Sequence, residues 1–352
     1  MRLTLVSDAW TPQVNGVVRT LTTTVAALEA RGHAVQTITP DRFVSVPCPT
    51  YPEIRLALTT PFRVGAMIAA FRPEAVHVAT EGPLGWLARG WCRKRGVPFT
   101  TSFHTRFPDY VAARTGLSPA YLWRIVTRFH ASARHILVAT PRLAEELAGH
   151  GLTRTRLWSR GVDLAQFHPG VAPPPAYADL PRPILLSVGR VAVEKNIAAF
   201  LAAVTPGTKV VVGDGPALAE MKARFPQARF LGSLAGTELA AAYAGADVFV
   251  FPSLTDTFGL VMIEALASGV PVAGFPVAGP LDVVGADGTG TVAGWHARVG
   301  AVGDDLAAAI AVALSADRGD CAAYAEHFRW EACVDQFVAG LAAVEGPVDL
   351  AA

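Results

Sequence analysis

The most informative residue of this sequence is a carboxylate in an otherwise apolar segment, 252–271. Turn residues open the segment and Gly269 and Pro271 close it, which predicts a helix over 258–267. Glu264 falls between Leu260 and Ile263 on a helical wheel that is apolar on every side, so we expect it to be buried. Because a buried carboxylate without donors is costly, Glu264 needs a partner, either another side chain or a ligand hydroxyl.

Asp256 lies just before this predicted helix, where its side chain can cap the first turn. The first amides of the helix, at Phe258, Gly259 and Leu260, are predicted to attract an anion, phosphate above all. The simpler alternative is a capping Asp and a Glu paired to another side chain.

Two cations follow a second apolar run, 183–190. Arg190 and Lys195 are five residues apart at the expected carboxyl end of a strand. An Arg fork and a Lys point charge at such a position can neutralise a diphosphate. Two solvated surface cations are the alternative.

Two further loops carry candidate groups. Gly16 follows the first predicted strand and begins a helix, where close backbone approach and the helix terminus favour phosphate, although an ordinary turn is equally compatible. His104 and Arg106 follow another predicted strand, 97–103. A lone histidine is most often structural.

The elements that position these residues form two similar halves. Strands are predicted at 2–7, 34–39, 74–79, 97–103 and 135–139, and again at 183–190, 208–215, 228–232, 247–253 and 270–275. Their near-continuous apolar runs, separated by helices, predict two α/β, Rossmann-like, doubly wound domains. The proline-rich segment between the halves predicts a linker. The expected division is therefore an N-terminal domain at 1–165, a linker at 166–182 and a C-terminal domain at 183–319, with a last helix at about 320–341.

Composition excludes several functions. A net charge of +1 with 17% charged residues among 352 gives no case for nucleic-acid binding. The four cysteines have no CxxC spacing and are expected to be reduced thiols, with no metal site. No signal peptide or membrane-spanning segment is expected. Two basic, aromatic segments, 89–95 and 123–130, are candidates for contact with an anionic membrane, with ordinary surface arginines as the alternative.

The order Asp256, T-F-G, Glu264 and A-L-A-S-G-V-P closely resembles the signature of glycosyltransferase family 4, and G-R-x-x-x-E-K-N at 189–196 is similar to that family's phosphate-binding pair. The resemblance implies a retaining enzyme of the GT-B fold, with two domains facing across a cleft. It also implies that the last helix packs back on the first domain. The first carboxylate of the signature is usually Glu, so Asp256 is a departure that shortens its reach.

The resemblance assigns roles to the candidate residues. Glu264 would bind the nucleotide ribose, whereas His104 and Asp256 would orient the donor hexose. The remaining positions divide between the donor phosphates, at Gly16, Arg190, Lys195, Phe258, Gly259 and Leu260, and the acceptor side, at Asp8, Glu81 and Arg106. No D-x-D motif occurs, so we expect no metal and no cofactor beyond the nucleotide-sugar substrate.

The donor and acceptor follow from the branch that the resemblance favours. T-D-T-F-G-L also occurs in mannosyl- and sulfoquinovosyl-transferases acting on lipids, which points to GDP-mannose, with UDP-glucose or UDP-glucuronate next. The expected acceptor is a lipid or glycan hydroxyl, reached from the cytoplasm at the inner face of the membrane. The competing hypotheses are an NAD-dependent dehydrogenase, which lacks its G-x-G-x-x-G here, and a nucleotide-sugar-binding protein without activity.

Overall fold

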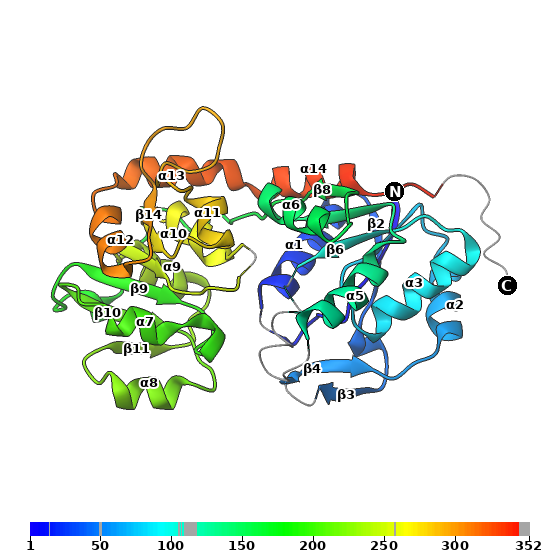
Figure 1. Ribbon diagram of the computed structural model, residues 1–352, viewed down its shortest axis with the longest axis horizontal. Helices are drawn as coiled ribbons and strands as arrows, with labels where there is room; N and C mark the ends of the chain where they lie inside the picture. Colours follow the sequence, from blue (N-terminus) through cyan, green and yellow to red (C-terminus); the bar gives the residue numbers. More distant parts are fainter. Residues whose placement is uncertain are drawn as a thin grey trace. The chain divides into compact units, whose positions relative to one another are not determined.

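The computed structural model describes residues 1–13, 15–48, 51–104, 106, 108, 118–256 and 258–344 (Figure 1). The chain divides into two compact units. Unit 1 comprises Met1–Ser159 and Glu331–Ala352, and unit 2 comprises Arg160–Trp330. The chain therefore passes from one unit to the other twice.

Unit 1 is built on a parallel six-stranded sheet of order β2-β1-β5-β6-β7-β8. Its strands are β1 (Arg2–Val6), β2 (Ala34–Ile38), β5 (Ala75–Val78), β6 (Thr100–Phe103), β7 (His135–Val138) and β8 (Thr155–Leu157), with a separate antiparallel pair, β3 (Ser45–Cys48) and β4 (Tyr51–Ala57). Its helices are α1 (Gly16–Ala30), η1 (Pro40–Arg42), α2 (Pro61–Phe71), α3 (Pro83–Arg95), α5 (Pro119–His130), α6 (Pro141–Gly149) and α14 (Trp330–Gly340), whose first residue belongs to unit 2.

The helices of unit 1 begin where the local sequence favours a start. Proline is the first residue of α2, α3, α5 and α6, a position where its missing N–H costs nothing. Asn15 and Thr60 cap α1 and α2 by accepting hydrogen bonds from first-turn amides. The inner strands β1, β5, β6 and β7 are buried on both faces except at the first residue of β1 and of β7, which explains the apolar character of β1, β5 and β7, whereas β6 is mostly polar.

Unit 2 has a parallel six-stranded sheet of order β11-β10-β9-β12-β13-β14, with helices around it (Figure 1). Its strands are β9 (Ile184–Val188), β10 (Thr208–Val212), β11 (Arg229–Gly232), β12 (Val248–Phe251), β13 (Val272–Gly274) and β14 (Gly300–Val302). Its helices are η2 (Pro175–Tyr177), η3 (Val193–Lys195), α7 (Ile197–Ala202), α8 (Leu218–Arg224), α9 (Gly236–Ala244), α10 (Leu260–Ala267), α11 (Ala278–Val283), α12 (Leu306–Ala313), α13 (Arg318–Ala325) and η4 (Glu326–Phe328).

The predicted fold class is confirmed: the chain forms two doubly wound parallel sheets. The strands β3, β4, β8 and β14 were not predicted, because β8 and β14 have only three residues each, and β3 and β4 each contain a proline, which argues against a strand. The single helix predicted at 320–341 is wrong. It is two helices, α13 and α14, separated by η4 and by Arg329, whose extended backbone (φ −71°, ψ 142°) cannot continue a helix.

The proline-rich segment 166–182 belongs to unit 2, where Phe167 is fully buried with its ring 5.6 Å from that of Tyr243. Helix α14 packs on unit 1. Phe337 lies against Trp158, the Gln336 side chain accepts a hydrogen bond from the Ser159 amide at 2.7 Å, and the His135 ring bonds to the carbonyl of Gly340.

Candidate active site

The sheet of unit 2 reverses its winding direction between β9 and β12, which are hydrogen-bonded neighbours. In open parallel sheets, ligands bind where the connections leave in opposite directions. The loop after β9 and the loop after β12 lie at this point and are tied together. The Asn196 side chain donates to the carbonyl of Pro252 at 3.1 Å, and the Ser253 hydroxyl donates to that of Glu194 at 3.4 Å.

An ion pair at this switch point joins two of the predicted donor residues. The Lys195 ammonium lies 2.6 and 2.8 Å from the two carboxylate oxygens of Asp256, and the side chains keep 27% and 18% of their surface exposed. The fold thus brings together a cation and a carboxylate that are 61 residues apart. Because both side chains keep part of their surface exposed, a ligand can contact either of them at this point.

Arg190 is an exposed side chain at the carboxyl end of β9, on a loop whose backbone is closely held. The amide of Val191 donates to the carbonyl of Asp214 at 2.9 Å, which joins this loop to the one after β10. Gly213 has φ +139°, and a Cβ there would lie 1.8 Å from the carbonyl oxygen of Gly189. Only glycine permits this approach, so the loops after β9 and β10 pack closely against each other next to Arg190.

Helix α10 begins at Leu260, two residues later than predicted, because Gly259 has φ +86° and cannot be helical. The N-cap residue is Gly259, and among the described residues Asp256 makes no capping bond to α10 but pairs with Lys195, so the expected cap by Asp256 is not formed. Phe258 is buried. The early amides of α10 keep the electropositive character of any helix start.

Glu264 is buried, as predicted, with 3% of its surface exposed. Its Oε2 accepts a hydrogen bond of 2.9 Å from the hydroxyl of Tyr243, on α9. Tyr243 was missed by the sequence analysis, although an isolated tyrosine in an alanine-rich helix is a signal for a buried hydroxyl that needs a partner. Glu264 therefore has a neutral donor on a neighbouring helix.

In unit 1, Asp8 caps α3. Its carboxylate accepts from the amides of Leu84 at 2.9 Å and Gly85 at 3.2 Å, and from the hydroxyl of Thr80 at 3.0 Å. Burial raises the pKa of Asp8 from 3.8 to about 6 against the effect of these donors. The contacts explain Asp8 as a structural cap; its predicted place on the acceptor side stays a prediction.

The other predicted residues of unit 1 also have defined partners. Glu81 lies 3.0 Å from Nε2 of the fully buried His130. Arg106 forms an ion pair with Glu146. Gly16 is exposed at the first position of α1, directly after the capping Asn15.

His104 follows β6 and is 8% exposed. Its Nε2 lies 2.8 Å from the hydroxyl of Ser102, and its ring packs edge-on against Trp158 with the ring centroids 5.4 Å apart. These contacts fix the orientation of the imidazole.

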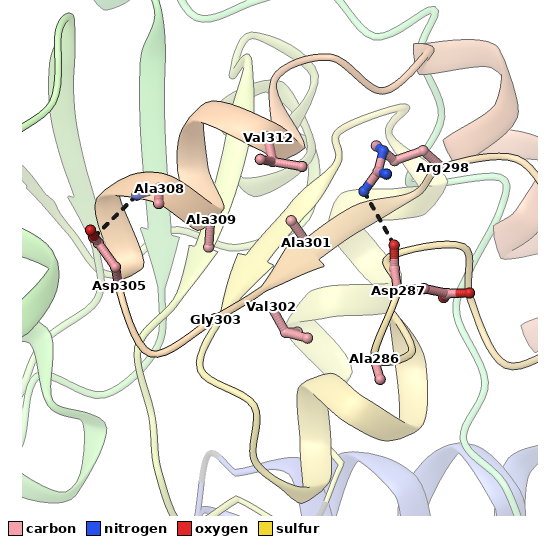
Figure 2. Close-up of a pocket in the computed structure, with 10 residues that line it drawn as sticks. All are labelled: Ala286, Asp287, Arg298, Ala301, Val302, Gly303, Asp305, Ala308, Ala309 and Val312. Atoms are coloured by element: carbon pink, nitrogen blue, oxygen red, sulfur yellow. Dashed lines mark hydrogen bonds between the residues drawn. The ribbon is translucent and has the colours of Figure 1, made fainter.

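A hollow of about 280 Å³ lies beside β14, on the opposite side of β13 from β12 (Figure 2). None of the predicted site residues lines it. Its polar groups already have partners: the Asp305 carboxylate accepts from the amides of Ala307 and Ala308, and Arg298 donates to the carbonyls of Asp287 and Gly300. The hollow is therefore distinct from the candidate donor site.

The two segments predicted to touch a membrane present less aromatic surface than expected. Trp91 and Trp123 are buried in the core of unit 1. The exposed face of α5 instead carries Tyr121, Arg124 and Ile125, together with Arg128 one turn on. Within the part of the chain that the structure describes, no helix has both the length and the apolarity needed to cross a bilayer.

Comparison with known proteins identifies the family. Residues 14–166 match the family described as Glycosyltransferase Family 4, and residues 182–316 match Glycosyl transferases group 1. A GDP-mannose-dependent alpha-mannosyltransferase of Mycolicibacterium smegmatis is 33% identical over 314 residues, which cover 82% of this chain and 84% of the relative. The chain belongs to glycosyltransferase family 4. It is a retaining hexosyltransferase, as the resemblance of its motifs implied.

Further relatives of this glycosyltransferase differ in substrate. Sulfoquinovosyl transferase SQD2 of Arabidopsis thaliana is 32% identical over 262 residues, which cover 70% of this chain and 51% of that protein. Among solved structures, sucrose-phosphate synthase of Thermosynechococcus elongatus superposes with a TM-score of 0.74 at 23% identity, covering 96% and 97% of the two chains. HepE of Anabaena in complex with UDP-glucose gives a TM-score of 0.68 at 15% identity, covering 96% and 98%. These structures show that the glycosyltransferase has the GT-B fold.

Proposed function

We propose that this glycosyltransferase transfers a mannosyl group from GDP-mannose to a hydroxyl group of a lipid, giving an α-linked product. The ion pair of Lys195 with Asp256 at the switch point of unit 2 is the observation that carries the proposal, because it places a cation and a sugar-binding carboxylate side by side. The choice of donor is supported by the relative that is a GDP-mannose-dependent alpha-mannosyltransferase.

Lys195 and Arg190 stabilise the departing diphosphate. The bond between the anomeric carbon and the phosphate oxygen breaks with its electrons on the diphosphate, where these cations and the start of α10 balance the developing charge. Glu264 accepts hydrogen bonds from the ribose hydroxyls, while Tyr243 donates to its Oε2. The charge is supplied by the chain, so the proposed reaction uses no metal and no cofactor.

The acceptor oxygen attacks the anomeric carbon on the face that the diphosphate leaves. Its proton passes to the leaving phosphate oxygen, so no covalent nucleophile is needed and the configuration is retained. Asp256 and His104 orient the hexose through its hydroxyls, and Gly16 contributes backbone to the phosphates. Asp8, Glu81 and Arg106 are proposed to shape the acceptor side, Asp8 indirectly through the α3 terminus.

A second candidate is the transfer of a UDP-activated sugar, glucose or glucuronate, to diacylglycerol. It is favoured by an alpha-monoglucosyldiacylglycerol synthase of Streptococcus pneumoniae, 28% identical over 310 residues. In either case the acceptor is a membrane lipid. We therefore place the reaction at the cytoplasmic face of the membrane, with the basic face of α5 as a contact for anionic lipid.

The donor is tested by thermal-shift measurements with GDP, UDP, GDP-mannose, UDP-glucose and UDP-glucuronate, followed by mass spectrometry of products formed with membrane lipids. The proposal predicts stabilisation by GDP and its mannose conjugate and a lipid product heavier by one hexose. Stabilisation by UDP alone, with a glucosylated product, supports the second candidate. Nicotinamide oxidation, or nucleotide-sugar binding without turnover by any acceptor, overturns both.

A further inference from the structure

A buried histidine of unit 1, His77, lies on the same face of the sheet as His104. Residues 100, 102 and 104 alternate along β6 and its continuation, so Thr100, Ser102 and His104 project to one side. His77, on β5, is the register partner of Thr100. Two imidazoles and two hydroxyls thus form one polar strip in an apolar interior.

The contacts along this strip are continuous. His77 Nδ1 lies 2.9 Å from the hydroxyl of Thr100, and His77 Nε2 lies 3.2 Å from that of Ser102. The Ser102 hydroxyl also lies 2.8 Å from His104 Nε2 and 3.1 Å from the carbonyl oxygen of Ala79. Ser102 is therefore the link between the two histidines.

One arrangement of protons makes every contact of Ser102 attractive. The hydroxyl has one proton and two lone pairs, and the Ala79 carbonyl can only accept. If Ser102 donates to Ala79, both imidazoles must donate to Ser102 from Nε2. If Ser102 instead donates to His104 or His77, its oxygen faces the Ala79 oxygen at 3.1 Å without a proton between them.

The same arrangement satisfies His77. With its proton on Nε2, His77 accepts at Nδ1 from the hydroxyl of Thr100, whose contact with the carbonyl of Val76 is longer, at 3.4 Å. Complete burial lowers the pKa of His77 to about 3, so the ring is neutral and carries a single proton.

Aromatic rings hold the strip in place. Edge-on packing sets the His77 centroid 5.0 Å from that of Phe337, on α14, and 5.9 Å from that of Trp158. Trp158 also packs edge-on against His104. Packing therefore restricts rotation of both rings, and the hydrogen bonds determine which nitrogen faces Ser102.

We infer that Ser102 and His77 are positioning residues that hold His104 as the Nε2–H tautomer. The position of this proton and the orientation of the His104 ring are then fixed before the donor hexose binds. The contact with the hexose rests on the proposed function, whereas the proton position follows from the hydrogen bonds within unit 1.

The tautomer is measured directly on the full chain labelled with ¹⁵N-histidine. Long-range ¹H–¹⁵N correlation spectra distinguish the two neutral tautomers, and His104→Gln assigns the His104 signals by their loss. We expect the Nε2–H pattern for His104 in the wild type and a mixture of both tautomers in Ser102→Ala. An Nδ1–H pattern in the wild type, or an unchanged pattern in Ser102→Ala, overturns the inference.

Kinetics provide the second readout. Ser102→Ala should lower kcat/KM for the donor about tenfold, the size of one hydrogen bond. His77→Leu should have a similar effect, and His77→Gln should restore activity because its amide can still donate to Ser102. Thr4→Val, which removes an equally buried hydroxyl bonded to Gln36 in the same sheet, should leave the rate unchanged.

The two arms separate failure of this inference from failure of the proposed function. The spectra need neither donor nor acceptor, so they stand even if another nucleotide sugar is the substrate. Equal rates for His77→Leu and His77→Gln contradict the positioning role, including when Ser102→Ala does not fold. An effect of Thr4→Val equal to that of Ser102→Ala shows that general destabilisation is being measured and also overturns it.

Discussion

Replacing Lys195 by alanine removes the cation on which the proposed chemistry depends. In the structure its ammonium is bonded to both oxygens of Asp256, with part of each side chain in contact with solvent. An ion pair this exposed contributes at most about 1 kcal/mol to stability, because solvent screens it. Lys195→Ala should therefore fold, with a small decrease in thermal midpoint.

The effect on transfer should be much larger than the effect on folding. Once the bound donor covers Lys195 and excludes water, a preorganised cation facing the developing negative charge is worth about 3 to 4 kcal/mol. Since each factor of ten in rate corresponds to about 1.4 kcal/mol, the loss in kcat/KM is at least about a hundredfold. The transfer step, and not only nucleotide affinity, should slow, because the charge develops as the diphosphate departs.

The assay follows product by mass spectrometry and released nucleoside diphosphate by a coupled enzyme. Lys222→Ala, on the exposed surface of α8, is the matched control for loss of a lysine and should retain full activity. The single variant Asp256→Asn and the double variant Asp256→Asn/Lys195→Ala distinguish two roles of Lys195, contact with the diphosphate and positioning of Asp256. If Lys195 contacts the diphosphate, its removal still slows the Asp256→Asn enzyme.

Two results refute this reasoning. Near-normal kcat/KM in folded Lys195→Ala shows that Lys195 does not stabilise the leaving group. If Lys195→Ala has no effect once Asp256 is neutralised, Lys195 serves only to hold that carboxylate.

Three other predictions address neighbouring features. Tyr243→Phe leaves the buried Glu264 with one hydrogen-bond donor fewer. The variant should lose about 1 to 3 kcal/mol of folding stability and bind the nucleotide about tenfold more weakly. Wild-type affinity, measured by calorimetry, argues against a ribose contact at Glu264. Gly213→Ala places a Cβ against the Gly189 carbonyl at a residue with positive φ, and should lower the free energy of unfolding by about 1 to 3 kcal/mol. Denaturant titration measures this change, and an unchanged midpoint contradicts the close packing of the two loops. The pKa of Asp8 is about 6 in the folded protein, compared with its usual value of 3.8. Protonated Asp8 therefore stabilises the fold below about pH 4, and this contribution is lost as the pH rises through 6. Each pKa unit corresponds to about 1.4 kcal/mol, so the stability of the wild type relative to Asp8→Asn should fall by about 3 kcal/mol between pH 4 and 7. A difference in thermal midpoint between the two proteins that does not change with pH contradicts this prediction.

Much of the fold could be predicted because the sequence patterns of its strands and helices depend on short segments. Most strands that are covered on both faces carry apolar runs, and a proline or a capping residue marks the first turn of several helices. The break between α13 and α14 was not readable, since the residues on either side of Arg329 favour a helix and only its backbone conformation interrupts them. Short edge strands such as β14 depend on their neighbours, which a sequence pattern does not show.

Individual residues of the candidate site could also be predicted from the sequence, whereas their partners could not. Glu264 stood out because its burial follows from the wheel of its own helix, and Arg190 and Lys195 because they follow a strand. The partner of Glu264 comes from a different helix, and the partner of Lys195 from a different loop. Those pairings depend on which strands are neighbours.

The sequence by itself determined that this protein has two doubly wound sheets and a family 4 donor motif, because alternating strands and helices and a charged residue in an apolar helix are properties of short segments. Only the tertiary structure decided that Lys195 holds Asp256, that Tyr243 holds Glu264, and that His77 reaches His104 through Ser102. The physical reason is that hydrogen bonds and ion pairs act over about 3 Å, and the order of strands in a sheet decides which distant residues come that close.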